Sequence, residues 1–280
     1  MNPVRTIERA RWNADLPEVV REVSRRWGLT VGEQFQHDGE CAWVAPVRDA
    51  HGTRLVLKLG WYHTEAAHEA DALRLWDGTG AVRLHASATL DGTIALLLER
   101  CEPGTTLKQA MAEPDQDVVV AGLLRRLWTD PPAGHPFRPL AEMCDLWADR
   151  FEERFARTPD VLDPGLAREG VRLFRLLPRT AGEHVLLCTD LHGGNILAAR
   201  REPWLVIDPK PYLGDPAYDA VQHLLNCDQR QATDPAGMAV RMADLLDLDP
   251  DRVALWFFAR CVVESAGWVE LRDVAARLAP

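Results

Sequence analysis

Three polar residues in one stretch of the chain have the types and spacing of a phosphoryl-transfer site. Asp190 and Asn195 stand five positions apart in CTDLHGGNIL, residues 188–197, and Asp208 closes the apolar run that follows. Phosphoryl transfer needs a carboxylate near the attacking hydroxyl and oxygen ligands for magnesium, and the D-x-x-x-x-N spacing is that of kinase catalytic loops. The pattern therefore predicts Asp190 as the catalytic residue, with Asn195 and Asp208 as metal ligands.

The neighbouring residues are typical of a loop and a hairpin. Gly193 and Gly194 allow a tight turn, and NILAA with WLVID favours a short hairpin that aims Asp208 at the same cavity. His192 is placed to orient a carboxylate by a hydrogen bond. An aspartate beside Gly or Pro often only caps a turn. We prefer the catalytic interpretation because all parts of the pattern occur together.

The first hundred residues predict an antiparallel sheet with one internal helix. Residues 16–27 carry apolar side chains at helical spacing, and residues 64–78 repeat that spacing with Thr64 as a candidate N-cap. Five segments indicate strands: 34–38, 39–49, 53–61, 82–90 and 93–101. Turn residues at 49–52 and Asp91-Gly92 join successive strands.

The pattern changes after the breaker cluster Glu102-Pro103-Gly104. Helical periodicity covers 105–112, 116–129, 139–157, 165–177, 216–227, 235–246, 250–266 and 268–278, with a small β insert at about 185–207. The sequence therefore predicts an α+β protein of two lobes. Residues 1–101 form a β-rich, nucleotide-binding lobe, and residues 102–280 form a mostly helical lobe with the catalytic loop and the acceptor site.

Composition limits the possible partners and the compartment. The 280 residues carry a formal net charge of −10, which disfavours nucleic acid and anionic membranes. We find neither a leader-like segment nor an apolar run of the roughly 18 residues that a membrane span needs. The six cysteines are scattered without the spacing of a zinc site, as expected of reduced thiols. We expect a cytoplasmic protein, with a monomer favoured.

The chain resembles the aminoglycoside phosphotransferase family, within it the streptomycin and hydroxyurea phosphotransferase branch. The phrases that carry the resemblance are CTDLHGGNIL, EPWLVIDPKPYLGDPAYD and LLLERCEPGTTL, and the similarity extends from about residue 30 to residue 230. The resemblance implies a bilobal protein-kinase-like fold, ATP or GTP as the phosphate donor, Mg2+, and a small-molecule acceptor.

The resemblance also implies roles for residues of the first lobe. Lys58 matches the family lysine that contacts the α and β phosphates, with Glu69 as its expected partner and Glu65 as the alternative. A lone strand lysine would otherwise be a solvated edge residue. Glu99 to Cys101 match the hinge whose backbone groups meet adenine. The phosphate loop is poor in glycine, with His37–Glu40 between the first two strands.

The chain departs from the family pattern beside both aspartates. Cys188 and Thr189 precede Asp190, where the family often has a histidine and a small residue, and Cys188 is expected to be a buried packing residue. Asp208 is followed by Pro209 and Lys210. Lys210 either contacts the γ-phosphate or pairs with Asp215 or Asp219 as a structural tie, and we favour the tie. Asp215 is expected to be structural.

The acceptor pocket is expected between the catalytic loop and the C-terminal helices. Its candidate lining residues are His223, Asn226, Asp228, Trp256, Glu264 and Trp268. A cationic aminoglycoside would need carboxylates such as Asp228 and Glu264, whereas a small neutral acceptor would not. The alternative for the tryptophans is helix packing, because apolar helical stripes usually face a core.

These observations predict a magnesium- and ATP-dependent O-phosphotransferase for a small molecule. The nearest acceptor class is an antibiotic, either a streptomycin-like aminoglycoside or hydroxyurea. One alternative is a metabolic kinase for an amino alcohol, sugar or amino acid. The other is a pseudokinase that binds nucleotide without turnover, which the intact set of Lys58, Asp190, Asn195 and Asp208 disfavours.

Overall fold

The computed structural model describes residues 8–36, 41–158 and 161–280, and the chain forms two compact units. The first unit runs to Thr105 and also contains Leu197–Ile207, and the second contains Thr106–Ile196 and Asp208–Pro280. The hairpin segment 197–207, which the sequence analysis assigns to the second lobe, thus belongs to the first unit. The proposed phosphate loop, His37–Glu40, lies outside the described residues.

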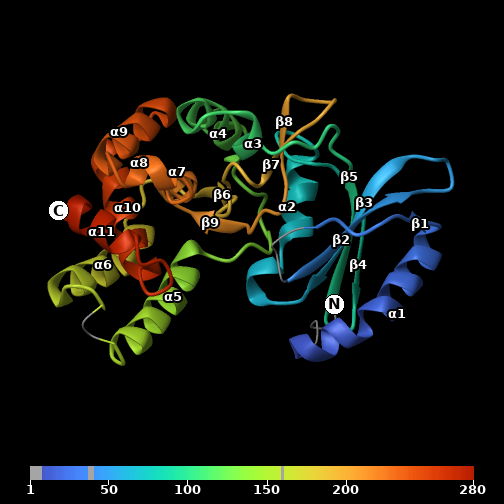
Figure 1. The fold of residues 1–280 in the computed structure, drawn as a ribbon, viewed down its shortest axis with the longest axis horizontal. Coiled ribbons are helices and arrows are strands. Elements are labelled where there is room, and N and C mark those ends of the chain that lie inside the picture. Colours follow the sequence, from blue (N-terminus) through green and yellow to red (C-terminus); the bar gives the residue numbers. More distant parts are fainter. Residues whose placement is uncertain (1–7, 37–40, 159–160) are drawn as a thin grey trace. The chain divides into compact units, whose positions relative to one another are not determined.

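The first unit is built on a five-stranded antiparallel sheet, as predicted (Figure 1). Its strands are β1 (Thr30–Val31), β2 (Ala42–Arg48), β3 (Arg54–Trp61), β4 (Leu84–Leu90) and β5 (Thr93–Glu99), in the order β1-β2-β3-β5-β4. Helix α1 (Arg9–Trp27) buries Val23 against Leu57 and neighbouring apolar residues of the sheet. Strand residues alternate between the two faces of a sheet, so Lys58 lies on the face opposite to Leu57.

The first strand differs from the prediction. Residues 34–36 are irregular, and the strand that pairs with β2 is the earlier Thr30–Val31. Gly32 donates its N–H to Pro46 O at 2.8 Å, but Pro46 has no N–H to return the bond. The ladder therefore stops at Val31, although Phe35 N still donates to Val44 O at 2.9 Å.

Two smaller elements complete the first unit. Helix α2 (Glu69–Trp76) begins later than predicted, because Thr64 lies in the separate turn η1 (Thr64–Ala66) and His68 is the N-cap residue. Strands β7 (Ile196–Ala198) and β8 (Trp204–Val206) pair as a hairpin, as predicted. Val206 forms a bridge with Ala81, which joins this hairpin to the segment before β4.

The second unit is mostly helical. Its helices are α3 (Leu107–Ala110), α4 (Glu113–Leu127), α5 (Leu140–Phe155), α6 (Pro164–Leu176), η3 (Leu177–Arg179), α7 (Pro216–Leu224), α8 (Asp228–Gln231), α9 (Pro235–Leu246), α10 (Pro250–Glu264) and α11 (Leu271–Leu278). Two features were not expected, the short α8 and strand β9 (Tyr212–Gly214), which pairs with β6 (Val185–Leu187). Strand β6 directly precedes the predicted catalytic loop, residues 188–197, and β9 follows Asp208, so this pairing places the two segments side by side.

Helix α10 is the core of the second unit. It contacts α5, α6, α7, α9 and α11, and it buries residues around its circumference, as a central helix does. Trp256 on α10 is fully buried and packs edge-to-face against Phe174 and Tyr218. Trp256 is therefore a packing residue, in agreement with the helix-packing interpretation favoured for the tryptophans over a place in the acceptor pocket. No helix in the described part of the chain is long and apolar enough to span a membrane.

Two helical glycines provide a test of how closely α6 and α10 approach. A Cβ atom on Gly170 of α6 would lie 2.4 Å from Val262 Cβ on α10, whereas a Cβ on Gly122 of α4 would meet nothing within 4 Å. We expect Gly170→Ala to destabilise the fold by about 1–3 kcal/mol through overpacking. Gly122→Ala should stabilise it by about 0.5–1 kcal/mol, because alanine favours the helix.

Urea denaturation of the two variants measures both effects. Equal changes in the free energy of unfolding would contradict the close contact between α6 and α10.

Candidate active site

The backbone of the catalytic loop is held by a buried carboxylate on α7. Asp219 is 0% exposed and accepts N–H hydrogen bonds from Cys188 at 2.8 Å, from Thr189 at 2.6 Å and from Trp128 Nε1 at 3.1 Å. Thr189 has a φ of 52°, an unusual conformation for a β-branched residue. The two adjacent N–H bonds to Asp219 hold this strained residue directly before Asp190.

A second turn brings Asp208 and Lys210 to the same loop. Asp208 also has a positive φ, 53°, and Lys210 N donates to Cys188 O at 2.9 Å. The Thr189 hydroxyl donates to Lys210 O. Lys210 Nζ lies 2.6 Å from Asp208 Oδ1 and 3.8 Å from Asp190 Oδ2. The structure thus brings together the two aspartates that the sequence singled out.

These distances correct the interpretation of Lys210. Its ammonium group pairs with Asp208, not with Asp215 or Asp219. Asp215 instead caps α7 through Ala217 N and accepts hydrogen bonds from Arg252 and Trp256 on α10. Asp215 is structural, as expected, and Lys210 is a cation of the candidate active site.

The Asp190 side chain is oriented by a residue that sequence reasoning missed. Gln222 Nε2 on α7 donates to Asp190 Oδ1 at 3.0 Å. His192, which was expected to orient a carboxylate, has its Nε2 4.0 Å from Asp190 Oδ1, too far for a hydrogen bond. His192 instead accepts the Gly194 N–H at Nδ1, over 3.1 Å. Gln222 could have been found from the sequence only by its position three residues after Asp219, which places both side chains on one face of the helix.

Burial and neighbouring charges change the acidity of Asp190. Burial raises its pKa to about 6, the negative charge of Asp208 acts in the same direction, and the cations Lys210 and Arg260 oppose both. Burial lowers the pKa of His192 to about 4, so that its ring is neutral near pH 7. An acceptor of protons whose pKa lies near the working pH is suited to general-base catalysis.

Asn195 is oriented so that its side-chain oxygen is available to a cation. Its Nδ2 donates to Asp190 O at 2.9 Å, and its backbone N donates to His192 O at 2.9 Å. An amide oxygen and the Asp208 carboxylate are ligands that magnesium prefers. The Asp208 carboxylate already attracts one cation, the Lys210 ammonium. The donor set therefore fits a magnesium site.

In the first unit, Lys58 and Glu69 form the expected ion pair. Lys58 Nζ on β3 lies 2.7 Å from both carboxylate oxygens of Glu69 on α2, and both side chains are buried. The side chain of Glu65, the alternative partner, lies outside the described part of the structure. Burial of a charged pair is costly unless its geometry is good, and these distances meet that requirement.

Glu99, which was predicted to lie in the hinge, is fixed by an arginine that the sequence did not reveal. Arg201, between β7 and β8, forms a two-pronged contact with the Glu99 carboxylate, with both N–O distances at 2.9 Å. It also donates to Gly78 O at 2.7 Å and to Ala81 O at 2.9 Å. Burial opposes ionisation of Glu99, but the Arg201 hydrogen bonds lower its pKa overall.

Cys101, also predicted to lie in the hinge, is not a reactive thiol. Burial raises its pKa to about 12, and the negative charge of Glu99 adds to this effect. The thiolate is the nucleophilic form of cysteine, so Cys101 is inert near neutral pH. Cys188, before the catalytic loop, is fully buried, as expected of a packing residue.

The candidate acceptor residues have different environments. Glu264 on α10 pairs with Arg260, so its charge is already neutralised. Asn226 is half-buried and donates to Gln222 O at 2.9 Å. Asp228 is exposed at the start of α8, and 45% of Trp268 is exposed. Asn226 thus contacts the backbone of Gln222, and Glu264 is linked to the Gln222 side chain through Arg260.

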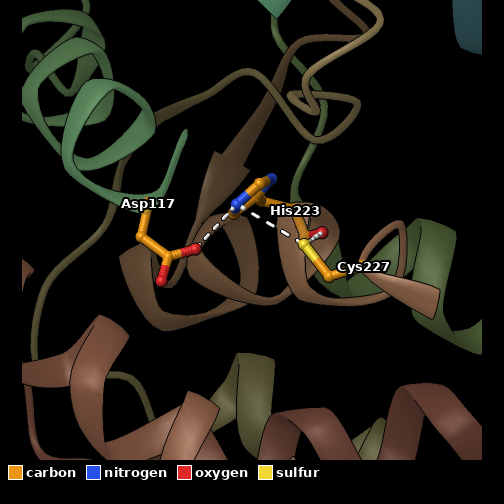
Figure 2. Close-up of side chains that lie close together, drawn as sticks. All are labelled: Asp117, His223 and Cys227. Atoms are coloured by element: carbon orange, nitrogen blue, oxygen red, sulfur yellow. Dashed lines mark hydrogen bonds and ion pairs between the residues drawn. The ribbon is translucent and has the colours of Figure 1, made fainter. Parts of the chain in front are cut away.

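His223 belongs to a buried cluster with Asp117 and Cys227, shown in Figure 2. Its Nε2 lies 3.0 Å from Asp117 Oδ1, and its ring is 1% exposed. His223 therefore joins α7 to α4, and it offers no open surface to an acceptor.

The residue types of this cluster could ligate a metal, but its charges oppose one. Asp117 Oδ1 accepts from Arg230 at 2.9 Å, and its Oδ2 accepts from Arg241 at 2.9 Å. Burial would raise the pKa of Asp117, but its hydrogen bonds hold the value at about 2. Two guanidinium groups already neutralise the carboxylate, and they would repel a metal cation. The cluster is an ion-pair network that anchors α7.

Comparison with known proteins gives one family for most of the chain. The family model described as aminoglycoside/hydroxyurea antibiotic resistance kinase matches residues 26–272. The hydroxyurea phosphotransferase of Kitasatospora aureofaciens is 38% identical over 265 residues, 93% of this chain and 75% of that protein. The streptomycin 6-kinase of Streptomyces glaucescens is 34% identical over 275 residues, 96% of this chain and 87% of that protein.

A solved structure supports the fold. Spectinomycin phosphotransferase in complex with ADP and spectinomycin has a TM-score of 0.57, 13% sequence identity, and coverage of 94% of each chain. At this identity the likeness concerns the fold alone. The predicted α+β, protein-kinase-like fold is confirmed.

The raised pKa of Asp190 can be measured directly. In metal-free protein we expect the Asp190 carboxyl carbon to titrate near pH 6 by 13C NMR, because burial disfavours its charged form. Below that pH the group is mostly protonated, and above it mostly ionised. Lys210→Met should raise the value further by removing a stabilising cation, whereas Lys210→Arg should leave it near 6. Titration of Asp190 near the ordinary value of about 4 would contradict the result.

Proposed function

The chain belongs to the aminoglycoside/hydroxyurea antibiotic resistance kinase family, and we propose that it transfers the γ-phosphoryl group of ATP to a hydroxyl of a small antibiotic molecule. The observation that carries this proposal is the arrangement of Asp190 and Asp208 around the ammonium group of Lys210. A carboxylate can accept the proton of the attacking hydroxyl, and a cation can neutralise negative charge on the transferred phosphoryl group, so this arrangement suits phosphoryl transfer.

In the proposed reaction, Asp190 orients the acceptor hydroxyl. A bond forms between the acceptor oxygen and the γ-phosphorus, and the bond from the γ-phosphorus to the oxygen it shares with the β-phosphate breaks. ADP leaves with that oxygen, and the hydroxyl proton passes to Asp190 late in the transfer. The raised pKa of Asp190 makes its carboxylate a better proton acceptor than an ordinary aspartate.

We assign the remaining roles by residue type and position. Lys58, held by Glu69, would contact the α and β phosphates, and the backbone of Glu99 to Cys101 would contact adenine. Asn195 and Asp208 would hold Mg2+, which when bound neutralises charge on the phosphates. Lys210, which pairs with Asp208, would face the transferred phosphoryl group. GTP remains an alternative donor.

The acceptor class is proposed from the named relatives. They are a streptomycin 6-kinase and a hydroxyurea phosphotransferase, so a streptomycin-like aminoglycoside or hydroxyurea is the proposed acceptor. The Glu264 carboxylate is already paired with Arg260. We therefore propose that Asn226, Asp228 and Trp268 contribute to the acceptor side, with Glu264 acting through Arg260.

The roles of the two aspartates can be separated by substitution. Asp190→Ala should lower kcat by about 10²–10⁴-fold, the usual contribution of a general base, and leave the Kd of magnesium-nucleotide within a few fold. Asp208→Ala should also weaken metal-dependent nucleotide binding. Labelled-ATP transfer assays and calorimetric titration measure these effects.

The exposed Asp130, in the loop after α4, provides a matched control. Asp130→Ala should retain both turnover and binding. Wild-type turnover by Asp190→Ala would remove the role assigned to that residue.

A panel of acceptors tests the substrate class. The acceptors are streptomycin, hydroxyurea, an amino alcohol, a sugar and an amino acid, and ADP release is followed with each. We expect streptomycin or hydroxyurea to give the highest kcat/KM. The Asp190→Ala variant supplies the background rate. If only a metabolite is phosphorylated, the protein is a metabolic kinase and the proposed acceptor class is wrong.

A further inference from the structure

The side chain of Gln222 lies between the proposed catalytic carboxylate and a buried cation. Its Nε2 donates to Asp190 Oδ1 at 3.0 Å, and its Oε1 accepts from Arg260 Nη2 at 2.6 Å. Arg260 is 1% exposed and stacks over the Tyr218 ring, with its Cζ 4.7 Å from the ring centre. A continuous row of polar groups therefore runs from the buried interior of the second unit to Asp190.

The chemistry at both ends of this row determines which way the amide points. An arginine side chain has only donors, so the group that faces Arg260 must be the amide oxygen. An ionised carboxylate has only acceptors, so the group that faces Asp190 must be the amide nitrogen. The side-chain amide of an isolated glutamine can flip, exchanging its oxygen and nitrogen, at little cost in energy. Only one orientation of the Gln222 amide is compatible with both partners.

The backbone of Gln222 is fixed as well. Three residues of the same helix hold α7 in place: Asp215 bonds Arg252 and Trp256 of α10, Asp219 bonds the backbone of the catalytic loop, and His223 bonds Asp117 of α4. Asn226 Nδ2 donates to Gln222 O at 2.9 Å. Neither the helix nor the amide is therefore free to rotate away from Asp190.

We propose that Gln222 is a positioning residue that holds the Asp190 carboxylate in its working orientation, and that Arg260 fixes the direction of the Gln222 amide. The inference rests on the proposed function of Asp190. With Oδ1 occupied by Gln222, Asp190 presents Oδ2 to the acceptor hydroxyl. Arg260 donates its hydrogen bond to Gln222 and not to Asp190, although its positive charge also lowers the pKa of Asp190, and Glu264 pairs with it.

Two substitutions of Gln222 distinguish its role in positioning Asp190 from a role limited to accepting the Arg260 hydrogen bond. Gln222→Met has a similar length and removes both hydrogen bonds. Gln222→Glu keeps an acceptor for Arg260, and strengthens it by charge, but replaces the donor to Asp190 with a second carboxylate. We expect both variants to lower kcat by about 10- to 100-fold, the loss typical of a misplaced reacting group. The KM for ATP should be unchanged.

The assay uses the full chain with MgATP. Transfer to streptomycin and to hydroxyurea is measured alongside ATP hydrolysis, in which water is the acceptor, and kcat is expressed per folded protein from thermal unfolding curves. Gln229→Met, an exposed glutamine on α8, is the matched control and should retain wild-type kcat. Combining Gln222→Met with Arg260→Lys should cost no more than Gln222→Met alone, because lysine keeps the positive charge that acts on Asp190 and the lost hydrogen bonds run through one amide.

The outcomes distinguish this inference from the proposed function. Wild-type kcat in Gln222→Glu would overturn the inference, since only the bond to Arg260 would then matter. A rise in the KM for ATP without a fall in kcat would also overturn it. If Asp190→Ala is inactive while Gln222→Met is fully active, the inference fails and the proposed function stands. If Asp190→Ala is active, the role of Asp190 itself is wrong.

Discussion

The buried carboxylate of Asp219 is the interaction on which the catalytic loop depends. A carboxylate without solvent is costly unless donors satisfy it, and the donors here are the adjacent N–H groups of Cys188 and Thr189 and the Trp128 indole. These bonds hold Thr189 at a positive φ, a strain of about 1–3 kcal/mol that persists only where the surroundings enforce it. The direction in which Asp190 leaves the backbone follows from this constraint.

Helix α7 therefore serves as the support of the loop. Successive polar residues along it have different partners: Asp215 bonds the central helix α10, Asp219 bonds the loop backbone, and Gln222 bonds the Asp190 side chain. Residues three and four positions apart lie on one helical face, so one rigid helix aligns all three contacts. The ion-pair network at Asp117 fixes the other end of α7. Positioning in this kinase is thus a property of a helix more than of the loop itself.

The sequence predicted the residues that belong to short, recognisable local motifs. Asp190, Asn195 and Asp208 were identified by spacing, and Lys58 and Glu69 by the resemblance to the family, although their roles stay predictions. Gln222 and Arg201 were missed because their partners lie 32 and 102 residues away in the chain. His192 was predicted to orient the carboxylate because it lies two positions after Asp190 in the sequence. The first strand was predicted at 34–38 and lies at Thr30–Val31, because the missing N–H of Pro46 acts through a pairing that periodicity does not show.

The hairpin between β7 and β8 makes the first unit discontinuous in the chain. A fragment that ends at Thr105 keeps the sheet and the Lys58–Glu69 pair but loses Arg201, and with it the two-pronged partner of Glu99 and the donors to Gly78 O and Ala81 O. Those groups would have to find water or rearrange. Truncation at Thr105 thus does not isolate the complete first unit. A fragment for biophysical work would need residues 197–207 grafted back through a linker.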